Sequence, residues 1–321
     1  MNAPVHTLFP LSHPDLKIWD VQYPPRQLHI QGHESALSLF NRLPNMGLAV
    51  VGTRAPQPRS LVRLKNLISA LGSSGGASGL VIISGFARGV DAFAHEAALD
   101  AGLPTIAVLA GGLDVPYPWQ NAQLRKRIVE QGGLLVSEVP MDHYPQPGQF
   151  IKRNRLIAGW SKATVVIEAS VRSGALNTAK WAREHHMTTY AVPCFPGDPA
   201  LAGNQNLLDR HEAHPLWGAF SLGETWSGLY SLRDQNETAQ HRSGNAETQS
   251  VTPTNDEAIL AQQVAQHCAT QAGATVHELL DWATEQKWLP QRFFESLQGA
   301  LQKQLILDRN GLLLKNPKNS R

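Results

Sequence analysis

Short apolar runs alternate with helical patterns through the middle of the chain, and this alternation predicts the fold class. The runs are rich in branched aliphatic residues and of strand length, and they lie at Gly47–Val51, Leu80–Ser84, Thr105–Leu109, Leu134–Val136, Thr164–Ile167 and Thr189–Val192. Helical patterns between them cover Arg59–Leu71, Ala92–Ala101, Ala122–Glu130, Arg153–Trp160 and Thr178–His186. Buried strands joined by helical crossovers form a parallel sheet. We therefore expect an α/β domain with a doubly wound, Rossmann-like parallel sheet over residues 47–230.

The pattern changes on both sides of this domain. Residues 1–46 read as a short N-terminal segment, irregular at first and weakly helical at Glu34–Arg42. Residues 231–255 are polar and poor in apolar side chains, which is typical of a flexible linker.

The last part of the chain, residues 256–315, has the outline of a winged-helix-like domain. It contains a helical pattern, a capping box at Thr275–Glu278 that opens a second helix, and a third helix from Pro290. Two apolar runs then flank Asn310-Gly311, a dipeptide typical of β-hairpins. Three helices followed by a β-hairpin are the elements of a winged-helix domain.

Composition narrows the function classes only a little. The net charge is +2 and 42% of residues are hydrophobic, so a polyanion site would be a local patch on a domain with a sizeable core. Two distant cysteines, Cys194 and Cys268, form neither a disulfide framework nor a zinc site. With no signal-peptide pattern and no apolar run of transmembrane length, we expect a cytoplasmic protein that does not enter a membrane.

The most informative stretch follows the second strand run. It reads Ser84-Gly85-Phe86-Ala87-Arg88-Gly89 and leads into an alanine-rich helix. Glycines between a strand and a helix let backbone N–H groups approach an anion, and the helix N-terminus adds partial positive charge. Arg88 would add a full charge. A tight turn that binds nothing fits the same residues.

Three further motifs lie where strands are expected to end, the edge at which such sheets bind ligands. Gly52 and Arg54 follow the first strand, and Ser173 and Gly174 precede a helix. The run Lys152-Arg153-Asn154-Arg155 adds three cations, which we expect on the rim of the same crevice, with Glu138 and Glu168 orienting them. Each motif alone is also consistent with a solvated turn or a capped loop.

No catalytic constellation or cofactor motif accompanies these groups. The histidines lack metal-ligand spacing, and no nucleophile elbow is present. A dinucleotide fingerprint is also missing. We therefore expect no metal, no cofactor and no enzymatic activity.

Taken in order, the motifs resemble the DNA processing protein A family, DprA or Smf. The resemblance runs from Tyr23-Pro24-Pro25 to about Asn206, and its pieces are Val51–Arg54, Ser84–His95, Gly112–Asn121, Ser137-Glu138, Arg153–Arg155 and Ser173–Ala179. Residues Gly203–Leu208 depart from the family pattern.

The resemblance implies a protein that binds single-stranded DNA without sequence preference. Family members protect incoming DNA during natural transformation, help load RecA recombinase onto it, and are typically homodimers. The DNA-binding residues expected here are Gly52, Arg54, Ser84, Gly85, Arg88, Gly89, Lys152, Arg153, Asn154, Arg155, Ser173 and Gly174.

Two other functions remain open on the sequence. Nucleotide phosphoribohydrolases of the same broad superfamily carry a Pro-Gly-Gly-x-Gly-Thr-x-x-Glu motif, whereas Ser173–Trp181 lacks the proline and the glutamate. A sensor could hold a small nucleotide in the crevice and signal through the winged helix. One crevice can hold either a nucleotide or a strand, so the residues do not separate these functions.

Overall fold

The structure is a computed structural model that divides into two compact units, Met1–His241 and Arg242–Arg321. In the first unit it describes residues 4–73, 79–194 and 198–226. In the second it describes Gln263, Gln266, Ala274–Thr275, Leu279, Trp282, Ile306–Arg309 and Leu312–Lys315. The expected linker, residues 231–255, lies outside these ranges.

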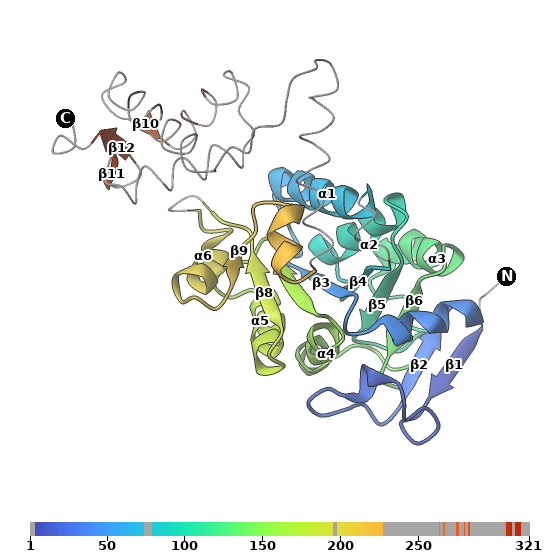
Figure 1. The fold of residues 1–321 in the computed structure, drawn as a ribbon. Coiled ribbons are helices and arrows are strands. Elements are labelled where there is room, and N and C mark those ends of the chain that lie inside the picture. The colour runs from blue at the N-terminus through green and yellow to red at the C-terminus, as the bar shows by residue number, and fades with distance from the viewer. Residues whose placement is uncertain are drawn as a thin grey trace, which may run out of the picture. The chain divides into compact units, whose positions relative to one another are not determined.

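The first unit is built on a nine-stranded sheet with the order β1-β2-β6-β5-β4-β3-β7-β8-β9 (Figure 1). The strands are β1 (Val5–Leu8), β2 (Leu28–Gln31), β3 (Gly47–Val51), β4 (Val81–Ser84), β5 (Thr105–Leu109), β6 (Leu134–Ser137), β7 (Ala163–Val166), β8 (Thr188–Ala191) and β9 (His214–Pro215). From β6 to β9 all neighbours are parallel. The predicted parallel sheet is therefore confirmed, and the ends of its strands differ from prediction by at most one residue.

The N-terminal segment was only partly predicted. It is not a separate piece, because β1 and β2 pair with each other and β2 pairs with β6, all antiparallel, so residues 1–46 extend the sheet. Both strands have only four residues, and only β2 alternates between buried and partly exposed positions, so their signal in the sequence is weak. Glu34–Arg42 is helical as expected, but as the 3₁₀ helix η2.

Helices cover both faces of the sheet (Figure 1). They are α1 (Pro58–Ser73), α2 (Val90–Asp100), α3 (Ala122–Glu130), α4 (Pro147–Gly159), α5 (Ala175–Glu184) and α6 (Ala202–Asp209). Leu48 and Val50 pack with α1 and α2, whereas Ala49 and Val51 on the same strand pack with α4, α5 and the N-terminal segment. Alternate residues of β3 thus serve two cores, as expected for a strand buried on both faces.

Strand order reverses at β3, which has β4 on one side and β7 on the other. The chain leaves β3 toward β6 and returns through α4 to β7. At such a topological switch point the loops that follow the two strands diverge and leave a crevice at the carboxyl edge of the sheet. The crevice here lies between the loops after β3 and β7.

The second unit contains a three-stranded antiparallel sheet, β10-β12-β11. Its strands are β10 (Ala274–Thr275), β11 (Ile306–Arg309) and β12 (Leu312–Lys315). The β11–β12 pairing confirms the predicted hairpin around residues 310–311. Most residues of the three expected helices lie outside the described ranges, so the winged-helix-like domain stays a prediction.

Across the part of the chain that the structure describes, no helix combines the length and the apolar character needed to cross a membrane.

Candidate functional site

A pocket of about 350 Å³ opens at the switch point. Its walls come from the loop after β3, the loop between β4 and α2, one side of α4, and the segment between β7 and α5. The lining residues are Val51, Gly52, Thr53, Arg54, Ala87, Asp91, Phe150, Arg153, Asn154, Ile157, Ser170, Ser173, Gly174, Ala175 and Thr178. Motifs from four separate stretches of sequence thus meet at one place, as predicted from their position at strand ends.

The rim of this pocket carries exposed cations next to an aromatic ring. The guanidinium carbon of Arg54 lies 4.9 Å from the centre of the Phe150 ring, a cation–π contact. Tyr117 meets the same ring edge-on, with ring centres 6.0 Å apart. Arg88, on the loop before α2, and Lys152, on α4, are also exposed. Arg54 lines the pocket and Arg88 follows Ala87, which also lines it, so these two cations form the charged rim. Lys152 was predicted in the same crevice, but its side chain lies toward Glu138 and is not part of the pocket lining.

The floor of the pocket contains Arg153, which we predicted on the rim. Its side chain is buried, and its Nη1 donates to the carbonyl oxygens of Gly85, at 2.6 Å, and Val108. A Cβ atom at Gly85 would lie 2.5 Å from both Arg153 Nη2 and Asp91 Oδ2. Gly85 thus makes room for these two side chains, and Arg153 holds the strand ends rather than presenting its charge to solvent.

Asp91 and His95 on α2 are buried beside Arg153, and burial shifts the pKa of each. Burial raises the pKa of Asp91 to about 6, opposed by the nearby Arg153 charge and by a hydrogen bond from the Ala87 N–H at 3.4 Å. Burial lowers the pKa of His95 to about 3, and Arg153 lowers it further. His95 is therefore neutral, and its Nδ1 lies 2.7 Å from the Thr105 hydroxyl.

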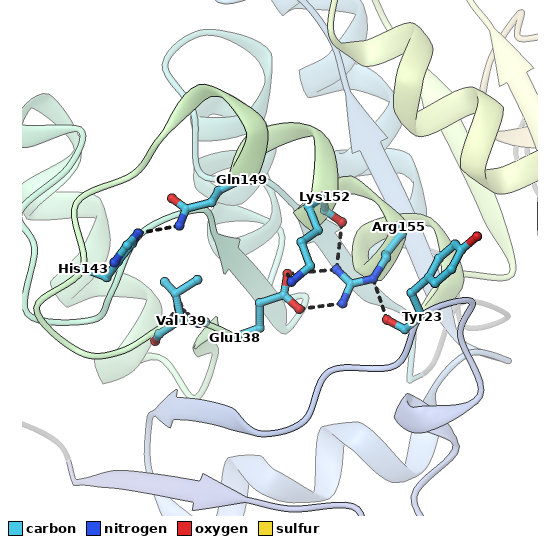
Figure 2. Close-up of polar contacts among 8 residues, drawn as sticks. Tyr23, Glu138, Val139, His143, Gln149, Lys152 and Arg155 are labelled. Carbon is cyan, nitrogen blue, oxygen red and sulfur yellow. Dashed lines mark hydrogen bonds and ion pairs between the residues drawn. The ribbon is translucent and has the colours of Figure 1, made fainter.

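Arg155 does not reach the rim either. It lies behind α4, where it forms a buried two-bond ion pair with Glu138 at 2.9 and 2.5 Å (Figure 2). Its Nε donates to the Tyr23 carbonyl at 2.8 Å, which fixes the N-terminal segment to α4. Lys152 Nζ lies 3.8 Å from the same carboxylate but stays 62% exposed. The expectation that Glu138 orients cations is thus confirmed.

Glu168 has a different role from the one predicted. Its carboxylate accepts a hydrogen bond from the Gln57 N–H at 3.0 Å, and its carbonyl accepts from Thr53 at 2.8 Å. Both bonds fix the loop between β3 and α1. Among the described residues Glu168 makes no ion pair, so it positions the backbone that carries Arg54.

Several predicted ligand donors serve packing instead. The Ser84 hydroxyl is buried and donates to the Val50 carbonyl at 2.6 Å. Gly89 has φ +80°, and a Cβ atom there would lie 2.4 Å from the Thr53 carbonyl oxygen. Gly52 leaves room in the same way for Val90. These glycines let two loops touch, which a side chain would prevent.

The opposite wall is more open. Gly174 is exposed, and a Cβ atom there would meet nothing within 4 Å. The Ser173 hydroxyl accepts from the Ala175 N–H at 3.3 Å and caps the start of α5. Asn154 donates to Asn177 Oδ1 at 3.2 Å, linking α4 to α5. This wall offers small polar groups around an accessible backbone.

Asp91 and Phe150 are two of the pocket residues that were not among the predicted site residues. Asp91 lies in the first turn of α2, two positions after Gly89, where an acidic residue suits the helix dipole and therefore gives no functional signal. The sequence leaves Phe150 as either a stacking surface or a core residue, and the usual burial of aromatic residues favours the core. Its partial exposure depends on packing against Arg54 and Tyr117, which the sequence does not place together.

The described residues contain no group of three or more histidines, cysteines, aspartates or glutamates arranged to hold a metal ion. What the pocket offers is a cationic edge, a flat aromatic surface, and small polar groups. Such a site suits a ligand that is anionic on one side and planar on the other.

Residues 11–226 match the DNA recombination-mediator protein A family. The chain belongs to this family. It is 39% identical to protein Smf of Synechocystis over 191 residues, which cover 60% of this chain and 46% of that protein. The chain spans about half the length of the curated relatives that it matches most strongly.

Two solved structures share the fold. DNA processing protein A of Streptococcus pneumoniae superposes with a TM-score of 0.60 and 32% identity, covering 68% of this chain and 72% of that chain. DNA processing protein A of Helicobacter pylori, described with a single-stranded DNA binding mode, superposes with a TM-score of 0.59 and 27% identity, covering 73% and 99%. The predicted resemblance is therefore confirmed.

Proposed function

We propose that this chain binds single-stranded DNA without sequence preference, and that the strand enters the switch-point pocket. The observation that carries the proposal is the pair of exposed cations, Arg54 and Arg88, beside the partly exposed Phe150 ring. Phosphates of a strand would contact the cations, and a base would stack on the ring. Both contacts ignore base identity, since every nucleotide has a phosphate and a π-face.

The floor supports this function indirectly. The side chains of Arg153 and Arg155 are engaged within the protein, Arg153 by carbonyl oxygens and Arg155 by the Glu138 carboxylate, so they are not free to bind phosphate. Arg153 fixes Gly85 on the loop that carries Arg88, and Glu168 fixes the loop that carries Arg54. Preformed sites bind more tightly because less conformational freedom is lost on binding.

We further propose that the chain acts in recombination as its family description implies. It would protect incoming DNA, help load RecA recombinase during natural transformation, work as a homodimer in the cytoplasm, and catalyse no reaction. The family match and the Helicobacter relative's single-stranded DNA binding support this role. A winged-helix-like domain in residues 256–315 would serve as an auxiliary contact.

A nucleotide-binding sensor is the second candidate, because a pocket of about 350 Å³ is near the small end of ligand sites and would hold one nucleotide. Phosphoribohydrolase activity would need a free carboxylate, whereas the Asp91 carboxylate accepts from Ala87 and faces Arg153. We therefore favour binding over hydrolysis.

Fluorescence anisotropy of labelled single-stranded and duplex oligonucleotides across a salt series tests the proposal. Arg88→Glu should weaken strand binding strongly, whereas Lys65→Glu, the same charge change on the exposed side of α1, should not. Two phosphate contacts, at Arg54 and Arg88, predict a slope of about −1.4 when the logarithm of affinity is plotted against the logarithm of salt concentration.

Other results would change the conclusion. Equal loss in both variants would mean that net charge, not the pocket, attracts DNA. Equal binding of strand and duplex, unaffected by Arg88→Glu, would move the contact to the second unit. No DNA binding together with binding of a mononucleotide would favour the sensor.

A further inference from the structure

A second pocket, of about 250 Å³, lies beside the first and plays no part in the proposed function so far. Its walls are the loop that carries Tyr117 and Pro118, the first turns of α3, and Gln31 at the end of β2. Tyr117, which is 43% exposed, gives the pocket an accessible aromatic ring, whereas Phe86 and Pro118 line it but are buried. We call it the α3 pocket.

The α3 pocket is held in shape by polar contacts made before any ligand arrives. Arg125 donates to the Leu113 carbonyl and to Gln31 Oε1 at 3.1 Å, which ties the loop, α3 and β2 together. Asn121 donates to the Phe86 carbonyl at 2.9 Å. Asn121 occupies the N-cap position of α3 but makes no capping bond. Its side chain fixes Phe86, whose φ is +59°.

The two pockets share a wall. Tyr117 lines the α3 pocket and touches Phe150, which lines the switch-point pocket. Phe86 faces the α3 pocket, and the next residue, Ala87, faces the other. A ligand that leaves the switch-point pocket over Phe150 therefore meets Tyr117 and then the α3 pocket.

The chemistry of this path suits a nucleic-acid strand. Beyond Tyr117, which is 43% exposed, Trp119 is 73% exposed, so aromatic rings continue toward α3. Lys126 is exposed at the pocket edge and can contact a phosphate, whereas Glu130 on the far edge would repel one. The pocket is smaller than the ~300–1,000 Å³ usual for drug-sized ligands, which fits one flat ring with its sugar and phosphate outside.

We propose that the α3 pocket accepts a second base of the same strand, with Lys126 contacting its phosphate. This inference rests on the proposed function and extends it by giving the strand a direction, from β3 toward β6 and β2. The occupant is a base of single-stranded DNA whose neighbouring nucleotides occupy the switch-point pocket.

Filling the pocket tests the proposal. Ala122 is exposed at the first residue of α3 and lines the pocket, so Ala122→Trp should occupy it without disturbing the core. Gln123→Trp, on the adjacent exposed position outside the pocket, is the matched control. Circular dichroism and light scattering would verify the fold and the oligomeric state of both variants.

Anisotropy should be measured with oligothymidines of about three and about twelve nucleotides, lengths that bracket common single-strand sites. Ala122→Trp should weaken binding of the longer strand about 5- to 100-fold, the worth of one stacked base, and leave the shorter one unchanged. Gln123→Trp should change neither. A 5-iodouracil scanned along the longer strand should crosslink to the peptide that contains Tyr117 and Trp119.

Each alternative result overturns the inference in a recognisable way. If Ala122→Trp and wild type bind both strands equally, the pocket holds no base although the proposed function stands. If Ala122→Trp changes the oligomeric state, the pocket belongs to an interface between copies. If a free mononucleotide binds the pocket and no strand binds at all, both this inference and the proposed function fail.

Discussion

The rim and the floor of the switch-point pocket use the same residue type for opposite purposes. Arg54 and Arg88 on the rim are exposed, and Arg54 rests on an aromatic ring. Arg153 and Arg155 are buried, and their guanidinium groups donate to carbonyl and carboxylate oxygens within the protein. An arginine can therefore contact a ligand or stabilise the fold, and its burial and hydrogen-bond partners decide which.

The difference has an energetic basis. A buried guanidinium loses its hydration and is stable only when its donors are paired, so removing a partner is costly. An exposed guanidinium keeps its hydration, and its removal costs the fold little. Substitutions on the floor should therefore change stability first, whereas those on the rim should change binding first.

The largest effect is expected at Arg155. Arg155→Ala leaves the buried Glu138 carboxylate with only the largely exposed Lys152, 3.8 Å away, as a cation partner, and should lower the free energy of unfolding by about 3–5 kcal/mol. Urea unfolding followed by circular dichroism measures this. The double variant Arg155→Met with Glu138→Leu should recover much of the loss, since no charge stays buried. A loss under about 1 kcal/mol in the single variant would mean that the pair is effectively solvated.

Asp91 gives the floor a pH dependence. Its pKa rises from 3.8 to about 6 on folding, so the folded state binds the proton more tightly than the unfolded state. The stability that Asp91 contributes is present below pH 3.8 and is lost, by about 3 kcal/mol, as pH rises through 6. Asp91→Asn should remove this slope from unfolding free energies measured across that range. An unchanged profile would show that the pKa of Asp91 is the same in the folded and unfolded states.

His95 should act in the opposite direction. Its pKa falls from 6.5 to about 3 on folding, so its contribution is present above pH 6.5 and is lost as pH falls toward 3. In the wild-type chain the slopes of His95 and Asp91 partly cancel. In His95→Gln only the Asp91 contribution remains, so the unfolding free energy should fall more steeply as pH rises from 3.8 to 6. The same pH series would detect this. If both variants give wild-type profiles, the pKa of each group is the same in the folded and unfolded states.

Rim substitutions should separate binding from stability. Arg54→Ala removes a charge and a cation–π contact and should weaken single-stranded DNA binding about tenfold, equivalent to about 1.4 kcal/mol. Unfolding free energy should change by less than about 0.5 kcal/mol because the side chain is exposed. Anisotropy and urea unfolding on the same preparation give both values. A large loss of unfolding free energy would mean that Arg54 stabilises the fold, as Arg153 and Arg155 on the floor are expected to do.

Lys152 tests the boundary between the two regions. It reaches the same carboxylate as Arg155 but is 62% exposed and 3.8 Å away. Lys152→Ala should change the unfolding free energy by at most about 0.5 kcal/mol, far less than Arg155→Ala. It should weaken DNA binding only a few-fold. An effect on stability comparable to that of Arg155→Ala would contradict the division into rim and floor.

Local pattern was enough to predict most of the sheet. Strands β3 and β5 have the predicted bounds, because runs such as Gly47–Val51 are apolar throughout and buried on both faces. The edge strands β1 and β2 were not predicted, since four-residue strands with mixed polarity have no distinct periodicity. Their place beside β6 depends on pairing across the sheet.

The location of the site could be predicted from the sequence, but which of its side chains are exposed to a ligand could not. Loops at the carboxyl ends of parallel strands must meet, so Gly52, Arg88 and Gly174 could be assigned to one crevice from chain order alone. Exposure could not be assigned in this way. Within Lys152-Arg153-Asn154-Arg155, consecutive side chains point toward solvent, the pocket floor, α5 and Glu138 in turn.

The sequence by itself determined the α/β class and the family. It also determined which motifs follow the parallel strands, and that these motifs gather at the carboxyl edge of the sheet. It could do so because periodicity and turn chemistry are local properties of the chain. Only the tertiary structure decided which cations remain free, which glycines serve packing, and that Phe150 is open to a ligand. Those properties depend on burial and on partners distant in sequence, and both exist only once the chain has folded.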